Sequence, residues 1–325
     1  MIQRMIRSSG MPRLPINSFP HRFPPNGFTR RLYHAGAAIL CAACVAGGAI
    51  VGASASQQPI AQFSTGVQLV EVYATVTDAN GGLITGLKRE DFEVQEDQEL
   101  QEISAFAAGE FPLTVVLGID RSWSMAGDPL RLAKTASQTF LRQLRPADRS
   151  MAVAIGSDAE IIAPLSNDHA QQQRAIDALD PWSTTSLHDA IISILDRLEP
   201  EPGRLAVIVF SDGVDRYSAA TAAQVIDRAR RSQALVYPIT LGKNRAALAA
   251  ELAVVSGGRS FLIRDAKALD ETFTTIAREL RYQYLLGYTP MKPGQSGAHE
   301  WRSIRVRVKG RTDLRVRARD GYTTE

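Results

Sequence analysis

From residue 112 onward, apolar segments of strand length alternate with amphipathic segments of helical length. Residues 113–119 form a continuous apolar run, which is typical of a strand buried on both faces of a sheet. The same reasoning predicts strands at 151–155, 205–210, 235–240 and 260–263, and helices at 128–144, 168–179, 187–198, 220–232, 245–255 and 269–282. This alternation predicts an α/β fold: a doubly wound, mostly parallel sheet with helices on both faces.

The segments before and after this region have the period of two that marks half-buried strands. Residues 70–77 alternate in this way, and shorter strands are predicted at 92–96 and 103–106. In the tail, residues 304–309 place apolar side chains on one face and Arg or Lys on the other, and residues 314–319 repeat the pattern. The tail therefore predicts a hairpin with one apolar and one cationic face.

These patterns divide the chain of 325 residues into four parts. We predict a leader or membrane anchor at 1–56, the N-terminal part of a β module at 62–108, an α/β domain at 111–285, and a C-terminal β hairpin at 286–325. Neither β segment is large enough to be stable alone. We therefore expect the two to pair in a small antiparallel β domain that flanks the α/β domain and is interrupted by it.

The turn after the first apolar strand carries a carboxylate and two hydroxyls. Asp120 follows residues 113–119, with Ser122 and Ser124 two and four positions later. The hydroxyls of residues 184–186 precede a predicted helix, and Asp212 follows another predicted strand. Because ligands collect at the carboxyl ends of the strands in such sheets, we expect these oxygens to meet there. Oxygen donors suit Mg²⁺, Mn²⁺ or Ca²⁺ better than Zn²⁺ or Cu²⁺.

This arrangement resembles the metal-ion-dependent adhesion site, or MIDAS, of von Willebrand factor type A (VWFA) domains. The family pattern is Asp-x-Ser-x-Ser, then a Thr, then an Asp. The matching positions are Asp120, Ser122, Ser124, Thr185 and Asp212. The resemblance covers residues 111–285 and implies a von Willebrand type A, Rossmann-like fold with these five residues as metal ligands. Residues 87–94 and 284–290 also resemble segments of a bacterial group of exported VWFA-related proteins.

One position departs from the family pattern. Trp123 stands between the two serines, where the family usually has glycine. If that glycine adopts an unusual backbone conformation, tryptophan would be strained there. Alternatively, Trp123 projects beside the metal as an aromatic anchor for a partner, or it folds back onto the domain. The departure concerns the geometry of the loop more than the presence of the metal.

The charges of the donors predict how such a site would bind. Asp120 and Asp212 are the only acidic candidates, the resemblance implies that one of them acts through water, and the hydroxyl donors are neutral, so a divalent cation with octahedral geometry stays under-neutralised. A coordination position filled by water can then accept an Asp or Glu carboxylate from a protein ligand. We therefore expect Mg²⁺, or Mn²⁺ or Ca²⁺, as the cofactor, and a function in protein binding or cell adhesion.

Enzymatic interpretations find less support in the sequence. The chain contains no Gly-x-Ser-x-Gly elbow, Walker loop, Gly-x-Gly-x-x-Gly fingerprint or His-Glu-x-x-His motif. We expect a protein that is not an enzyme. A metal-assisted hydrolase or phosphatase is the alternative, and a scaffold in which the metal is purely structural is a third.

Asp189, His188 and the cationic face of the tail need separate interpretation. Asp189 either supports the site or only favours the start of its helix, and the lone His188 is expected to have a structural or solvated role. The cationic face of the tail could bind an anionic surface or nucleic acid. We expect it to be a solvated face and expect no nucleic-acid partner, because the tail lacks interleaved aromatic residues.

The first 55 residues predict export. They contain six arginines and no Lys, Asp or Glu, and removing these charges from the formal net charge of +3 leaves −3 for the remainder. A charge-free apolar run at 35–53 follows the arginines, and small residues at 53–55 suit a signal-peptide cleavage site. An uncleaved anchor is the alternative. Either reading predicts an exported protein that is periplasmic, displayed at the cell surface or secreted.

Overall fold

The computed structural model describes residues 69–109, 111–242, 246–264, 267–292 and 299–324. The predicted leader at 1–56 lies outside them. Among the described residues, no helix has both the length and the apolar character that a membrane span requires.

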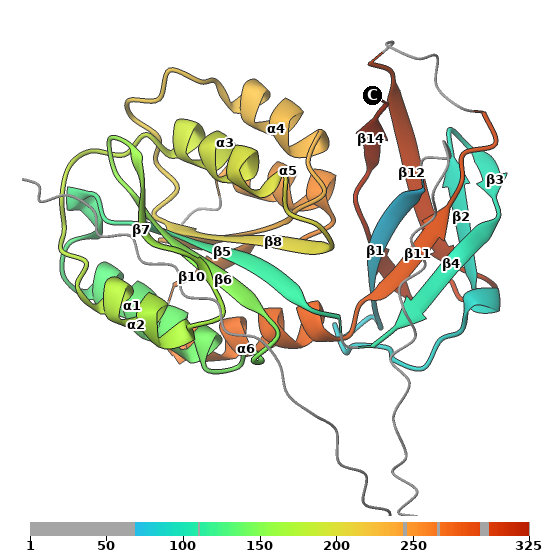
Figure 1. The fold of residues 1–325 in the computed structure, drawn as a ribbon, viewed down its shortest axis with the longest axis horizontal. Coiled ribbons are helices and arrows are strands. Elements are labelled where there is room, and N and C mark those ends of the chain that lie inside the picture. The colour runs from blue at the N-terminus through green and yellow to red at the C-terminus, as the bar shows by residue number, and fades with distance from the viewer. Residues whose placement is uncertain (1–68, 110, 243–245, 265–266, 293–298, 325) are drawn as a thin grey trace, which may run out of the picture. The chain divides into compact units, whose positions relative to one another are not determined.

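A six-stranded sheet forms the centre of the α/β domain (Figure 1). Its strands, in spatial order, are β10 (Phe261–Ile263), β9 (Leu235–Leu241), β8 (Arg204–Ser211), β5 (Leu113–Asp120), β6 (Arg149–Ile155) and β7 (Ala159–Ser166). All neighbouring pairs are parallel except β6 and β7. The predicted fold class, a mostly parallel doubly wound sheet, is therefore confirmed.

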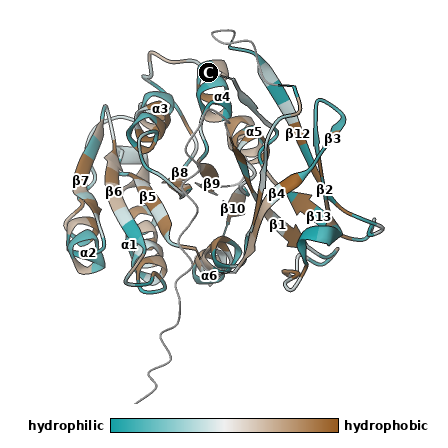
Figure 2. Cartoon of the chain, turned by 45° about the vertical axis from the view of Figure 1, so that its right-hand side comes forward, coloured by the Kyte–Doolittle hydropathy of each residue, from teal (hydrophilic) through white to brown (hydrophobic). Residues whose placement is uncertain are grey.

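Successive side chains of the central strands enter two different hydrophobic cores, because strand residues point alternately to opposite faces. In β5, Val115 and Leu117 pack on one face and Val116 packs on the other. The first core is completed by α1 (Asp128–Leu141), α2 (His169–Asp177) and α6 (Lys267–Arg281). The second is completed by α3 (Leu187–Leu198), α4 (Ala222–Arg230) and α5 (Ala247–Ser256). Figures 1 and 2 show these helices on the two sides of the sheet.

The remaining strands form the β module, which has two four-stranded sheets. One has the order β13 (Arg315–Arg317), β1 (Val70–Thr77), β11 (Tyr284–Tyr288) and β4 (Ile103–Ala108). The other has the order β14 (Gly321–Thr323), β12 (Trp301–Val308), β2 (Phe92–Glu96) and β3 (Glu99–Gln101). Both sheets contain strands from before and after the α/β domain, as predicted, and they share one hydrophobic core.

The prediction that the C-terminal strands form a hairpin is wrong. β12 pairs with β2 and β14, whereas β13 pairs with β1 in the other sheet. The alternation within β12 is as expected, since Ile304, Val306 and Val308 are buried and the intervening Arg305 and Arg307 are exposed. Periodicity predicted the faces of each strand correctly, but it contains no information about which strand lies alongside.

Several other strands differ from expectation, and the short strands β3 and β14 were not predicted. β1 is buried along almost its whole length rather than on one face: Tyr73 packs into the α/β core, and Thr75 accepts a hydrogen bond from Gln283 Nε2 at 3.1 Å. The edge strand β7 was not predicted. At the end of the α/β domain, the predicted boundary at 285 lies within β11, which already pairs with β1 and β4.

Candidate metal site

Asp120 is the last residue of β5 and is completely buried. One carboxylate oxygen accepts a hydrogen bond from the Ser122 backbone N–H at 2.8 Å, and the other accepts one from the Ser211 hydroxyl at 2.6 Å. Burial raises the pKa of the Asp120 carboxyl, the hydrogen bonds from Ser211 and Ser122 oppose this rise, and the charge of Asp212 adds to it. A bound cation would relieve the cost of a buried carboxylate that faces a second one.

The two serine hydroxyls of the motif lie together. Ser122 Oγ and Ser124 Oγ share a hydrogen bond at 3.1 Å, in which either can be the donor. Ser122 is buried and Ser124 is exposed, so this oxygen pair reaches from the buried carboxylate to the surface.

Asp212 follows β8, which lies directly beside β5 in the sheet. Ile119 is paired with Phe210, and this register brings the end of each strand to the same edge. The helices that follow the two strands, α1 and α4, pack on opposite faces, which makes this edge the topological switch point where ligands bind in such sheets. Asp212 Oδ1 accepts a hydrogen bond from the Val214 backbone N–H at 3.0 Å, and this contact orients the carboxylate.

Backbone hydrogen bonds join the three loops that carry the predicted donors. The loop of Thr185 is joined to the loop of Asp120 through Trp182 N–H to Arg121 O at 2.7 Å and Trp123 N–H to Ser183 O at 3.1 Å. Thr185 O accepts hydrogen bonds from Arg216 N–H at 3.1 Å and Tyr217 N–H at 3.3 Å, in the loop after Asp212. All five predicted donors thus lie on one connected set of loops, although their action as metal ligands stays a prediction.

Ser211 was missed at the sequence level. It is buried, and its hydroxyl donates to Asp120 while accepting the Gly213 backbone N–H at 3.0 Å. It therefore links the two acidic loops. The sequence did contain a signal for it: a serine stands directly before Asp212 at the end of a buried strand, where its hydroxyl can reach a residue at the end of the neighbouring strand.

The tryptophan within the motif is exposed and unstrained. Trp123 begins a short 3-10 turn, Trp123–Met125. Among the described residues, only Asp97, Gln98 and Ser183 combine a side chain with a positive φ, so Trp123 does not occupy a glycine conformation. Its side chain is 62% exposed, which contradicts the interpretation that it folds back onto the domain.

Asp189 and His188 have structural contacts. The two oxygens of Asp189 accept the backbone N–H groups of Ala219 and Ala220, each at 2.8 Å, so Asp189 anchors the segment before α4. His188 Nδ1 lies 3.0 Å from Ala220 O and 3.7 Å from an Asp215 oxygen. The expectation of a structural role for His188 fits these contacts. Asp189 lies in the first turn of α3, where an acidic residue favours the start of the helix, and it also anchors the loop that follows Asp212.

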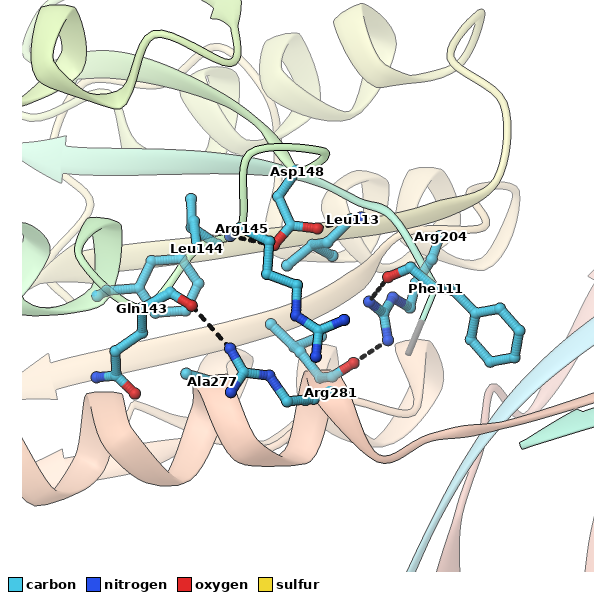
Figure 3. Close-up of a pocket in the computed structure, with 11 residues that line it drawn as sticks. Phe111, Leu113, Gln143, Leu144, Arg145, Asp148, Arg204, Ala277 and Arg281 are labelled. Atoms are coloured by element: carbon cyan, nitrogen blue, oxygen red, sulfur yellow. Dashed lines mark hydrogen bonds between the residues drawn. The ribbon is translucent and has the colours of Figure 1, made fainter. Parts of the chain in front are cut away.

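The opposite edge of the sheet contains a small cavity of about 20 Å³ (Figure 3). Arg204, the first residue of β8, is buried there and donates hydrogen bonds to the carbonyls of Phe111 and Leu280. Burial lowers the pKa of its guanidinium to about 10, and the charge of Asp148 opposes this. A volume of this size holds about one water molecule, so the cavity is too small for an organic ligand.

Among the described residues, no three His, Cys, Asp or Glu side chains are grouped so that they could hold a metal ion. A cation at the carboxyl edge would therefore depend on hydroxyl oxygens besides Asp120 and Asp212. This donor chemistry suits Mg²⁺ and Mn²⁺ and is unsuited to soft metals.

The family model of the von Willebrand factor type A domain matches residues 115–214. The matched segment runs from β5 past Asp212 and so contains all five predicted donors. The resemblance to von Willebrand factor type A domains is thereby confirmed for this part of the chain. No curated protein matches the chain.

Solved structures with a similar fold come from bacteria and from an animal. A von Willebrand factor type A protein from Catenulispora acidiphila is 15% identical, with 81% of this chain and 75% of that chain covered and a TM-score of 0.48. The conserved hypothetical protein BatB from Bacteroides thetaiotaomicron is 17% identical over 51% of this chain and 98% of that chain, with a TM-score of 0.42. Proximal thread matrix protein 1 from the mussel byssus, solved with a zinc-occupied MIDAS motif, is 16% identical over 58% and 50%, with a TM-score of 0.48.

Proposed function

We propose that this protein is a metal-dependent protein-binding module that is not an enzyme. In this proposal a divalent cation, Mg²⁺ or Mn²⁺, is held by Asp120, Ser122, Ser124, Thr185 and Asp212, and it coordinates an Asp or Glu carboxylate of a protein partner. The single observation that carries the proposal is the buried, hydrogen-bonded Asp120 at the start of a turn whose two serine hydroxyls lie together.

The charge balance supports a site that binds a partner's carboxylate rather than one in which the cation is fully satisfied by this chain. With one of the two carboxylates acting through water and the hydroxyls adding no charge, the charge of the cation is incompletely compensated. Arg216 is exposed and forms no ion pair within the described part of the chain, so it can attract an approaching carboxylate. Because Ser124 is exposed, the metal would lie within reach of a partner.

The part of the proposal that concerns location rests on residues 1–55 alone. Their arginines and following apolar run support export, and with it a partner outside the cytoplasm.

Binding of Mn²⁺ to the purified protein tests the proposal, because Mn²⁺ speeds the relaxation of water protons that exchange through its coordination sphere. We expect one bound Mn²⁺ per chain, displaced by Mg²⁺, with at least one exchangeable water. Adding N-acetyl-glutamate amide should displace that water and lower the relaxation rate. The Ser122→Ala/Ser124→Ala variant should lose the Mn²⁺ site, whereas Asp180→Asn, an exposed position in the Thr185 loop, should retain it.

Two results would contradict the proposal. Wild-type protein that binds no divalent cation would remove the metal site altogether. A bound Mn²⁺ without exchangeable water would instead favour a purely structural metal that holds the loops together.

A further inference from the structure

Exposed apolar side chains gather on the three loops of the candidate metal site. Of the eleven large hydrophobic side chains that are exposed among the described residues, four lie there, which is more than scattered surface residues would place on such short segments. They are Trp123 (62% exposed), Trp182 (61%), Val214 (41%) and Tyr217 (64%). We refer to these four residues as the apolar rim.

Each rim residue adjoins a predicted metal donor. Trp123 lies between Ser122 and Ser124, and Trp182 lies in the loop of Thr185. The Val214 N–H is hydrogen-bonded to the Asp212 carboxylate, and the Tyr217 N–H to the Thr185 carbonyl. The rim residues therefore come from the same three segments of the chain as the predicted donors.

The two tryptophans are held on a rigid pair of loops. The hydrogen bonds between Trp182 and Arg121 and between Trp123 and Ser183 fix the backbone on both sides. Ser183, which lies next to Trp182, keeps a φ of 76°, and its hydroxyl accepts the Ser157 backbone N–H at 3.2 Å. A non-glycine residue adopts this conformation only where its surroundings hold it. Binding through these indoles would therefore cost little loss of backbone conformational freedom.

We infer that the partner presents its metal-binding Asp or Glu between apolar side chains, and that Trp123 and Trp182 select it. This inference rests on the proposed function and specifies its partner. Trp, Tyr and Arg are the residues that most often dominate protein interfaces, and Trp123, Trp182, Tyr217 and the exposed Arg216 supply them here. Apolar contacts around the carboxylate exclude water, which strengthens its attraction to the cation. A partner with polar residues beside the carboxylate would leave water around the rim and so would bind more weakly.

A phage-displayed library of random linear peptides, selected on the Mn²⁺-loaded protein and eluted with EDTA, tests this inference. We expect the eluted peptides to share an Asp or Glu with apolar neighbours. Synthetic copies should bind Trp123→Ala and Trp182→Ala roughly 10- to 30-fold more weakly than wild type. Trp123→Phe and Trp182→Phe should recover most of the affinity. Leu100→Ala, at a position 59% exposed in the β module, should bind like wild type.

The outcomes separate this inference from the proposed function. Metal-dependent peptides that lack apolar neighbours, or that bind the tryptophan variants as well as wild type, would overturn the inference and leave the proposed function standing. A selection without any EDTA-eluted peptide would overturn both. Metal-independent binding of phosphatidylcholine vesicles that is lost in Trp123→Ala would assign the rim to a membrane surface and overturn the inference. In every variant, an unchanged rise in melting temperature with Mg²⁺ shows that the site is intact.

Discussion

The two edges of the central sheet each bury one charged residue from neighbouring strands, but the two residues are used differently. At the amino edge, the Arg204 guanidinium donates to two backbone carbonyls of the same chain, and the remaining cavity holds about 20 Å³. At the carboxyl edge, Asp120 accepts hydrogen bonds from the Ser122 backbone N–H and the Ser211 hydroxyl, and the loops of the predicted donors carry the exposed Trp123 and Trp182. Arg204 therefore serves stability, whereas the carboxylate and hydroxyl oxygens at the carboxyl edge keep lone pairs that can bind a cation.

The amino edge also joins the two parts of the molecule. Phe111 precedes β5 and Leu280 lies near the end of α6, so Arg204 binds the chain where it enters the α/β domain and where it leaves. Contacts of β13 add to this junction, because Arg317 forms an ion pair at 2.7 Å with Glu279, a buried residue of α6. The α/β domain and the β module accordingly belong to one compact unit.

Replacing Arg204 should have the largest effect on stability. Arg204→Met leaves the Phe111 and Leu280 carbonyls without their donor, and we expect a loss of about 3 kcal/mol in the free energy of unfolding. Urea denaturation measures it, with the exposed Arg197→Met as control. The Mg²⁺ affinity of the folded variant should be unchanged, and a large fall in that affinity would break the distinction between the two edges.

Ser211→Ala should weaken the metal site more than it weakens the fold. The variant loses the hydrogen bond that orients Asp120, and the loss of such a supporting contact typically reduces metal affinity by about 10-fold or more. Isothermal titration with Mg²⁺ measures this, and Ser211→Thr, which keeps the hydroxyl, should retain most of the affinity. Equal affinities for wild type and Ser211→Ala would show that Ser211 does not position the site.

Asp189→Ala should lower stability by about 1 kcal/mol, because the backbone N–H groups of Ala219 and Ala220 lose a charged acceptor. Thermal unfolding without metal measures the loss. Metal affinity should stay within about twofold of wild type, in contrast to Ser211→Ala. If it falls as far as in Ser211→Ala, Asp189 belongs to the support of the site.

Trp123→Ala should have the smallest effect on stability, within about 0.5 kcal/mol, because its exposed indole contributes little to the core. Chemical denaturation in the absence of metal measures it. A loss above about 1 kcal/mol would mean that the indole packs on the domain in solution and is not available to a partner.

Much of this arrangement could be predicted from local patterns. The central strands were predicted because a short, continuous apolar run is typical of a strand buried on both faces. The set of donors from three segments followed from the rule that the carboxyl ends of parallel strands share one edge of the sheet. The edge strand β7 was missed because its exposed side chains interrupt the apolar pattern. The position of the Trp123 side chain stayed open between three interpretations, since burial depends on neighbours that are distant in sequence.

The sequence by itself determined the period of each element, the faces that β12 buries, and the oxygen-bearing residues at the ends of β5 and β8. Only the tertiary structure decided that β12 and β13 lie in opposite sheets, that Ser211 bonds to Asp120, and that Trp182 is held beside the loop of Trp123. The physical reason is the separation along the chain of the residues that determine each feature. Side-chain periodicity is set by backbone geometry within a few residues, whereas strand pairing and loop contacts depend on the packing of segments that are far apart in the chain.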